Sequence, residues 1–161
     1  MSIKVDYPTS EDIHCSIDDV DYTELFYYPD QKHLIRKEQF VLGQRIMARV
    51  QDSNSSGIVF GGWIFSQMDT GVAVVAQKKT GGPVATIGVD DFLFLDCVLP
   101  GELVTVYCAL KDVGNTSIRF KAEAWAIDHK EGQAERKVAS GLFTFVALDG
   151  QGQPRMISSQ L

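Results

Sequence analysis

The sequence predicts an α+β protein in which an antiparallel β-sheet wraps around one long central helix, at about Gly62–Lys79. Three observations support this prediction. A nearly continuous apolar segment ends in helix stop signals, and four strand-like segments follow it. The connections among those strands are of hairpin length, which requires antiparallel pairing. Nothing but the sheet is available to cover a long apolar helix, so the sheet must wrap around it.

The helix is predicted from an apolar run that is too long for a single strand. The run closes with Lys78 and Lys79, and Gly81, Gly82 and Pro83 follow. Basic residues in a last turn, then glycine and proline, are typical of a helix end. The helix would be about 26 Å long. It would be apolar on most sides, like a helix buried in a core.

The strands are predicted from β-forming residues between segments rich in turn residues. In one of them, Ser117, Arg119, Lys121 and Glu123 alternate with Ile118, Phe120, Ala122 and Ala124, which indicates one polar and one apolar face. The predicted strands are 40–50, 84–95, 102–113, 116–127 and 136–148.

Length and composition indicate one globular domain. The chain has 161 residues, of which 45% are hydrophobic and 22% charged. We predict an acidic N-terminal extension at 1–38, a single domain at 39–155 and a C-terminal tail at 156–161. The extension carries nine acidic and four basic residues. It is either a solvated, partly ordered segment or a docking or lid segment whose apolar residues 25–28 pack on the domain.

Several partners and compartments are not expected. The chain has no basic stripe with interleaved aromatic residues, so nucleic acid is excluded as a partner. No segment supplies the roughly 20 apolar residues of a membrane span, and there is no secretory signal. The three cysteines form no CxxC pair, so we expect no metal site and a cytoplasmic location. Cys97 and Cys108 lie in apolar surroundings and are predicted to be buried.

Asp69 is the only charged residue between Gly57 and Gln77, in the middle of the predicted helix. A carboxylate in such surroundings has two interpretations. It is either a structural group, hydrogen-bonded to Ser66, to Thr70 or to a neighbouring strand, or a catalytic group. In the catalytic case desolvation raises its pKa, and it activates water or attacks a carbonyl carbon.

Gly61 and Gly62 stand at the predicted start of the helix. Backbone amides there are unpaired and lie at the positive end of the helix dipole, so they can form an oxyanion hole. A turn that needs glycine explains the pair equally well. Asp69 lies about 12 Å further along the helix, too far for one carbonyl group to span. If both sites act on one carbonyl, they come from different subunits, which requires at least a dimer.

The segment Asn54–Asp69 (NSSGIVFGGWIFSQMD) resembles the signature of the hotdog-fold acyl-CoA thioesterases, most closely the YciA-type subgroup. The similarity continues through 113–117, 123–125 and 143–149 and covers about residues 40–155. It implies the hotdog fold and hydrolysis of acyl-CoA to a free acid and coenzyme A. No cofactor is implied beyond the coenzyme A of substrate and product. The chain departs from the subgroup pattern at Ser56, Ile58 and Asp96–Cys97.

The resemblance also implies roles for single residues. Asp69 would be the catalytic carboxylate, as general base or nucleophile. Gly61, with Gly62 beside it, would polarise the thioester carbonyl of the opposing subunit, and Asn54 would assist.

Further residues are expected to bind the substrate. The resemblance places coenzyme A at the turn formed by Asn115, Thr116 and Ser117, and Phe60 belongs to the signature. Lys79 is either a charge at the end of the helix or a contact to a phosphate of coenzyme A.

Two other functions are considered. Hydration of an enoyl-CoA would need a histidine near the site, but His14, His33 and His129 all lie outside the helix and its flanking loop. A catalytically silent acyl-CoA-binding protein would bind coenzyme A without hydrolysis. The family suggests dimers that assemble further, into hexamers (trimers of dimers) or tetramers.

Overall fold

The computed structural model describes residues 40–128 and 135–157, so the predicted N-terminal extension lies outside the described residues. A short 3₁₀ helix (Val50–Asp52) separates the first strand from the long helix. In chain order the elements are β1 (Val41–Met47), α1 (Gly61–Thr80), β2 (Val84–Phe94), β3 (Leu103–Val113), β4 (Ser117–Ile127) and β5 (Arg136–Ala147).

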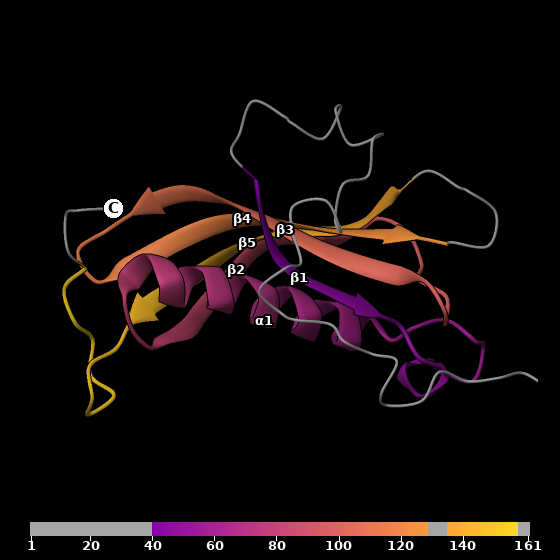
Figure 1. The fold of residues 1–161 in the computed structure, drawn as a ribbon, viewed down its shortest axis with the longest axis horizontal. Coiled ribbons are helices and arrows are strands. Elements are labelled where there is room, and N and C mark those ends of the chain that lie inside the picture. Colours follow the sequence, from indigo (N-terminus) through magenta and orange to yellow (C-terminus); the bar gives the residue numbers. More distant parts are fainter. Residues whose placement is uncertain (1–39, 129–134, 158–161) are drawn as a thin grey trace, which may run out of the picture. The chain divides into compact units, whose positions relative to one another are not determined.

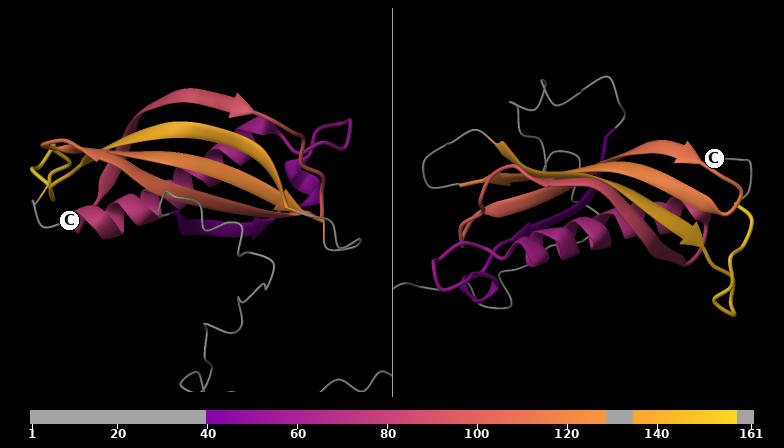
Figure 2. Two further views of the ribbon diagram at one scale, coloured as in Figure 1. Left: turned by 90° about the horizontal axis from the view of Figure 1, so that it is seen from above. Right: turned by 180° about the vertical axis from the view of Figure 1, so that it is seen from behind.

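The five strands form one antiparallel sheet in the order β1-β3-β4-β5-β2. Helix α1 lies across one face of this sheet, and the strands curve over it (Figures 1 and 2). The predicted α+β architecture is therefore confirmed, with every strand within three residues of its expected bounds. Strand β2 forms one edge of the sheet and β1 the other.

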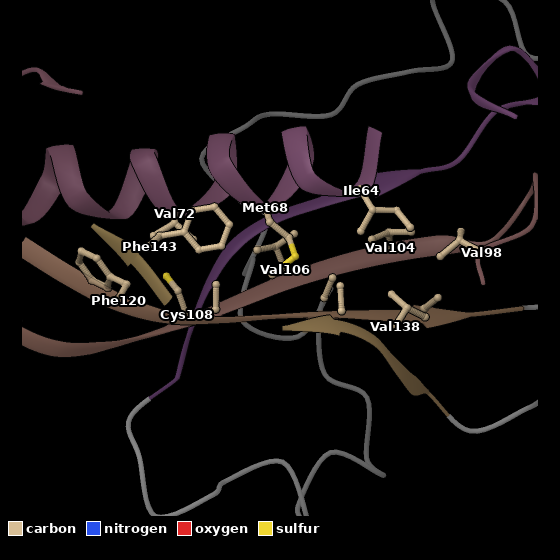
Figure 3. Packing of buried hydrophobic residues seen from close by; sticks show 14 of the residues in the cluster. Ile64, Met68, Val72, Val98, Val104, Val106, Cys108, Phe120, Val138 and Phe143 are labelled. Atoms are coloured by element: carbon tan, nitrogen blue, oxygen red, sulfur yellow. The ribbon is translucent and has the colours of Figure 1, made fainter. Parts of the chain in front are cut away.

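The core lies between α1 and the sheet. Ile64, Met68 and Val72 are spaced at helical intervals and point from the helix toward the strands (Figure 3). They meet side chains of the β3 to β5 strands, among them Val106 and Phe143, which are fully buried.

The helix is buried on one face only, which corrects the expectation of burial on most sides. Val74, for example, is 55% exposed. The sheet covers the helix from one direction, so the solvent side of an apolar helix stays open in the single chain.

On the covered side, the helix packs closely against β1 where two glycines meet. A Cβ on Gly43 in β1 would lie 2.7 Å from the carbonyl oxygen of Gly71 in α1.

The predicted helix end is confirmed. Gly81 caps α1 in the left-handed conformation (φ 71°), and its amide donates to the Gln77 carbonyl. Arg155 donates to the Thr80 carbonyl at 2.7 Å and so ties the C-terminal segment to the helix. Ile157, which we placed in the tail, packs against the core.

The two cysteines of the domain differ in environment. Cys108 is buried as predicted, and burial raises the pKa of its thiol to about 12. Cys97 is exposed, which corrects the prediction of burial. It lies just beyond the end of β2, in a loop that Arg136 holds through the Cys97 carbonyl at 2.7 Å.

Candidate active site

Asp69 lies on the side of α1 that faces the edge strand β2. The Thr86 hydroxyl donates to its Oδ1 at 2.6 Å. Gln67, two residues earlier, lies on the other side of the helix and accepts from Gln44 of β1 at 2.5 Å. The helix thus directs its one carboxylate toward the free β2 edge.

The surroundings of Asp69 differ from those expected of a buried carboxylate. Its side chain is only partly buried, and the bonding threonine is exposed. A hydrogen bond between Asp69 and a neighbouring strand is what the structural interpretation of this residue predicts, and the Thr86 bond fits it. This bond engages one oxygen of the Asp69 carboxylate, and within the described part of the chain no other side chain bonds the carboxylate. The second oxygen is therefore available to a water molecule or a substrate.

Three residues four apart form a stripe on α1 next to β2, because positions i, i+4 and i+8 share one side of a helix. Asp69 meets Thr86, and one turn earlier Phe65 meets Phe92 with ring centroids 5.0 Å apart. One turn earlier again is Gly61, where a Cβ would lie 2.8 Å from the Phe94 ring. Close packing against Phe94 is therefore one reason for glycine at position 61.

The N-terminal end of α1 offers backbone amides. The Trp63 amide donates to the Phe60 carbonyl at 3.0 Å, whereas the Gly61 and Gly62 amides have no partner among the described residues. The N-cap residue Phe60 supplies no side-chain hydrogen bond. Gly62 faces open space, since a Cβ there would meet nothing within 4 Å. A carbonyl oxygen can approach the amides from this side, where the helix dipole favours negative charge.

Asn54 holds the loop that leads into the helix. Its side-chain oxygen accepts from the amides of Ser56 at 2.9 Å and Ile58 at 3.2 Å. The turn is completed by Gly57 with φ 77°. Ser56 and Ile58, the two residues of this loop that depart from the family pattern, are therefore held by their backbone amides. Because every residue except proline has such an amide, these substitutions do not disturb the loop.

The residues predicted to bind coenzyme A lie at the opposite end of the helix. The Asn115 carbonyl accepts from Ile157, and the Thr116 carbonyl accepts from Ala147 at the end of β5, both at 2.8 Å. The same C-terminal segment reaches the end of α1 through Arg155. Lys79 is exposed in the last helical turn.

One chain therefore divides the predicted site between two ends of the helix, with Asp69 between them. Asn54, Phe60, Gly61 and Gly62 lie at the N-terminal end, and the turn at Asn115–Ser117 lies near the C-terminal end. A helix of 20 residues is about 30 Å long. The chain by itself does not bring these groups together.

Sequence reasoning missed Thr86. It lies 17 positions beyond Asp69, near the start of a strand that was predicted from its apolar residues. The sequence does place a hydroxyl residue in the first strand after the helix that carries Asp69. This signal is weak, because only the packing of the strand against the helix brings the two residues together.

No group of His, Cys, Asp or Glu in residues 40–128 and 135–157 could hold a metal ion. No helix in the same residues is long and apolar enough to cross a membrane.

Known proteins share this sequence pattern. The thioesterase superfamily matches residues 56–133. An uncharacterized acyl-CoA thioester hydrolase of Haemophilus influenzae is 39% identical over 124 residues, which cover 76% of this chain and 80% of that protein. The chain is an enzyme of the acyl-CoA thioester hydrolase family. YciA of Escherichia coli, another member of this family, is 36% identical over 116 residues, or 70% of this chain and 87% of YciA.

Solved structures of this family share the fold. HI0827, a hexameric broad-specificity acyl-coenzyme A thioesterase solved as an aspartate-to-alanine variant, superimposes with a TM-score of 0.72 at 36% identity. The match covers 74% of this chain and 88% of that one. The predicted family and the hotdog fold are confirmed. The roles of single residues stay predictions.

Proposed function

We propose that the protein hydrolyses acyl-CoA thioesters to a free acid and coenzyme A, at a site shared by two chains, with Asp69 as the catalytic carboxylate. One observation carries the proposal. The only charged side chain in the central part of α1 is held by Thr86 at the free edge of the sheet, with one carboxylate oxygen left open. The family relationship supports the same chemistry.

Asp69 can serve hydrolysis in two ways. As a general base it takes a proton from water, whose oxygen then attacks the thioester carbonyl carbon. As a nucleophile it attacks that carbon itself and forms a mixed anhydride, which water then cleaves. In both routes the carbon–sulfur bond breaks and the sulfur of coenzyme A leaves as thiolate, which is then protonated. Thr86 fixes the orientation of the carboxylate for either route.

The amides at the start of α1 supply the second part of the mechanism. As the tetrahedral intermediate forms, negative charge collects on the former carbonyl oxygen. The Gly61 and Gly62 amides and the helix dipole stabilise that charge. Asn54, whose side-chain oxygen is engaged by the loop, orders the water or the carbonyl through its amide nitrogen.

A second copy of the chain completes the site. Among the described strands, β2 is paired on one side only. It exposes apolar side chains such as Ile87 (61%), and Leu95 just beyond it is 51% exposed. Two copies that meet along β2 in opposite directions bring the start of one helix toward the middle of the other. The hexameric state of HI0827 favours dimers that assemble into trimers of dimers.

Coenzyme A is the only group required besides water, and no separate cofactor takes part. We place it along the turn at Asn115, Thr116 and Ser117, with Phe60 of the signature against the substrate. Lys79, exposed in the last turn of α1, lies at the same end of the domain as this turn and provides a positive charge for a phosphate.

The test is release of free thiol from a series of acyl-CoA substrates by the wild type and by Asp69→Asn. The variant is nearly isosteric and replaces a partly exposed group, so its fold is expected to be unchanged. We expect thiol release by the wild type, and binding of coenzyme A without release by the variant.

Two results would contradict this assignment. Near-wild-type hydrolysis by Asp69→Asn would remove Asp69 from the mechanism. Binding of acyl-CoA without hydrolysis by the wild type would favour a silent acyl-CoA-binding protein.

A further inference from the structure

Three phenylalanines, one of them in the stripe that carries Asp69, form a continuous aromatic wall between α1 and β2. Phe65 of α1 packs against Phe92 of β2 with ring centroids 5.0 Å apart. Phe92 meets Phe94 edge-on at 4.9 Å. Behind them lies Phe143 of β5, fully buried, with its ring 5.8 Å from Phe65. The wall is these three residues, Phe65, Phe92 and Phe94.

The wall is close to the catalytic carboxylate. Phe65 precedes Asp69 by four residues and shares its side of the helix. The two positions are about 6 Å apart along the helix axis. An acyl group whose carbonyl carbon reaches Asp69, and which extends toward the N-terminal end of α1, meets Phe65 after a few methylene groups.

The backbone is shaped to hold these rings in place. A Cβ on Gly141 of β5 would lie 2.8 Å from Phe92, and a Cβ on Gly61 would lie 2.8 Å from Phe94. The pairing of β2 with β5 shifts register between Asp90 and Leu93, and Asp91 there adopts φ 51°. Such a bulge re-aims the side chains beside it.

Two glycines therefore leave room for the rings, and a bulge directs them toward the helix. Each ring is in contact with at least one other, so the wall resists displacement as a unit. Phe94 remains 56% exposed and Phe65 37% exposed, so the wall presents an apolar surface that a ligand can reach.

We infer that this wall closes the acyl end of the site and restricts efficient hydrolysis to acyl-CoA with short acyl chains. The inference rests on the proposed function, whose substrate class it narrows. A short chain gains apolar contact with the rings. A long chain must displace Phe65 and Phe92 from their packing against Phe143 and Gly141.

The test compares kcat/KM for butyryl-CoA and dodecanoyl-CoA in the wild type, Phe65→Ala, Phe92→Leu and Val74→Ala. The wild type is expected to prefer butyryl-CoA by about 10-fold or more. Both wall variants lower that preference by about 10-fold. Val74→Ala is the matched control, because Val74 is an apolar residue of the same helix, is 55% exposed and lies on neither β2 nor the wall. It leaves the preference unchanged.

The outcomes separate the inference from the function beneath it. Equal turnover of both substrates by the wild type, or an unchanged preference in Phe65→Ala, would overturn the wall and leave thioester hydrolysis intact. Absence of turnover with every acyl-CoA would overturn the proposed function and the inference with it. If Phe92→Leu does not fold, the Phe65→Ala variant alone decides the test. Phe65→Ala is expected to fold, because Phe65 is partly exposed and alanine favours a helix.

Discussion

In residues 40–128 and 135–157 the carboxylate of Asp69 is bonded by one side chain, the hydroxyl of Thr86. This arrangement separates two effects that substitutions can remove independently. Replacing the aspartate removes the reacting group, whereas replacing the threonine leaves that group in place but free to rotate. Thr86 is in this account a positioning residue.

Thr86→Val is therefore expected to lower kcat by about 10-fold with little change in KM, because a hydrogen bond to a charged group contributes about 1.5 kcal/mol or more. Thr86→Ser keeps the hydroxyl and should restore kcat. Steady-state kinetics on one acyl-CoA substrate measure both. If the serine variant is as slow as the valine variant, the hydroxyl does not position Asp69.

Single residues were predictable from sequence where their chemistry stood out against their neighbours. Asp69 was such a residue, a lone charge in an apolar run. Thr86 was not, because its partner is 17 positions away and only the packing of α1 against β2 pairs them. Cys97 was misplaced because the apolar run continues beyond β2 into an exposed loop.

Among the elements, the loop from β2 to β3 is fixed by one guanidinium. Arg136 at the start of β5 bonds both oxygens of Glu102, at 2.7 and 2.8 Å, and Oδ2 of Asp96 at 2.9 Å. The Cys97 amide and then Arg136 hold the pKa of Asp96 below its ordinary value. Glu102 is only 4% exposed. Asp96, at which this chain departs from the family pattern, is therefore held by partners from the same chain.

Arg136→Ala should lower the free energy of unfolding by about 3 kcal/mol, because it leaves the buried Glu102 charge without its partner. Arg119→Ala is the control. Arg119 bonds the Thr144 hydroxyl at 3.2 Å and no other group in the part of the chain that the structure describes, so its loss should cost about 1 kcal/mol or less. Urea unfolding compares the two. Equal destabilisation would show that the Arg136 contacts do not hold the loop.

Elements were predictable to the extent that their signals are local. The end of α1 follows from Lys78, Lys79 and Gly81, and the observed helix stops there. The register shifts in β2 are set instead by what the strand packs against, including Gly141 of β5. The one-sided burial of α1 also depends on where the sheet lies, which apolar content alone does not reveal.

At the scale of the described domain, the candidate groups lie at the two ends of α1 and, with Asp69, in its middle. Strand β2 beside them is an edge strand of the described sheet. This distribution predicts that activity depends on association through β2. Ile87 of that strand is 61% exposed and is not part of the described hydrophobic core. A charged side chain at this position therefore leaves the chain able to fold.

Ile87→Lys is expected to reduce the oligomer to smaller species and to abolish thioester hydrolysis together, because a charge at a paired edge must be desolvated. Light scattering after size-exclusion chromatography gives the mass, and circular dichroism checks the fold. A fully active variant of unchanged mass would place the subunit contact elsewhere.

The shared site is the central claim, and subunit complementation tests it most directly. Asp69→Asn removes the carboxylate. Gly62→Pro removes an oxyanion amide at a helical position where a first-turn proline is tolerated and a side chain meets open space. Gly62→Ala, which keeps the amide, controls for the added carbon. Each of the two disabling variants alone should be nearly inactive, Gly62→Pro by about 100-fold or more.

The two disabled chains are then co-expressed, and mass spectrometry confirms that they assemble together. A shared site predicts that mixed assemblies regain activity, because one of their sites combines an intact Asp69 from one chain with an intact Gly62 from the other. Mixed assemblies that remain as inactive as either variant alone would contradict the account, since every site would then lie within a single chain.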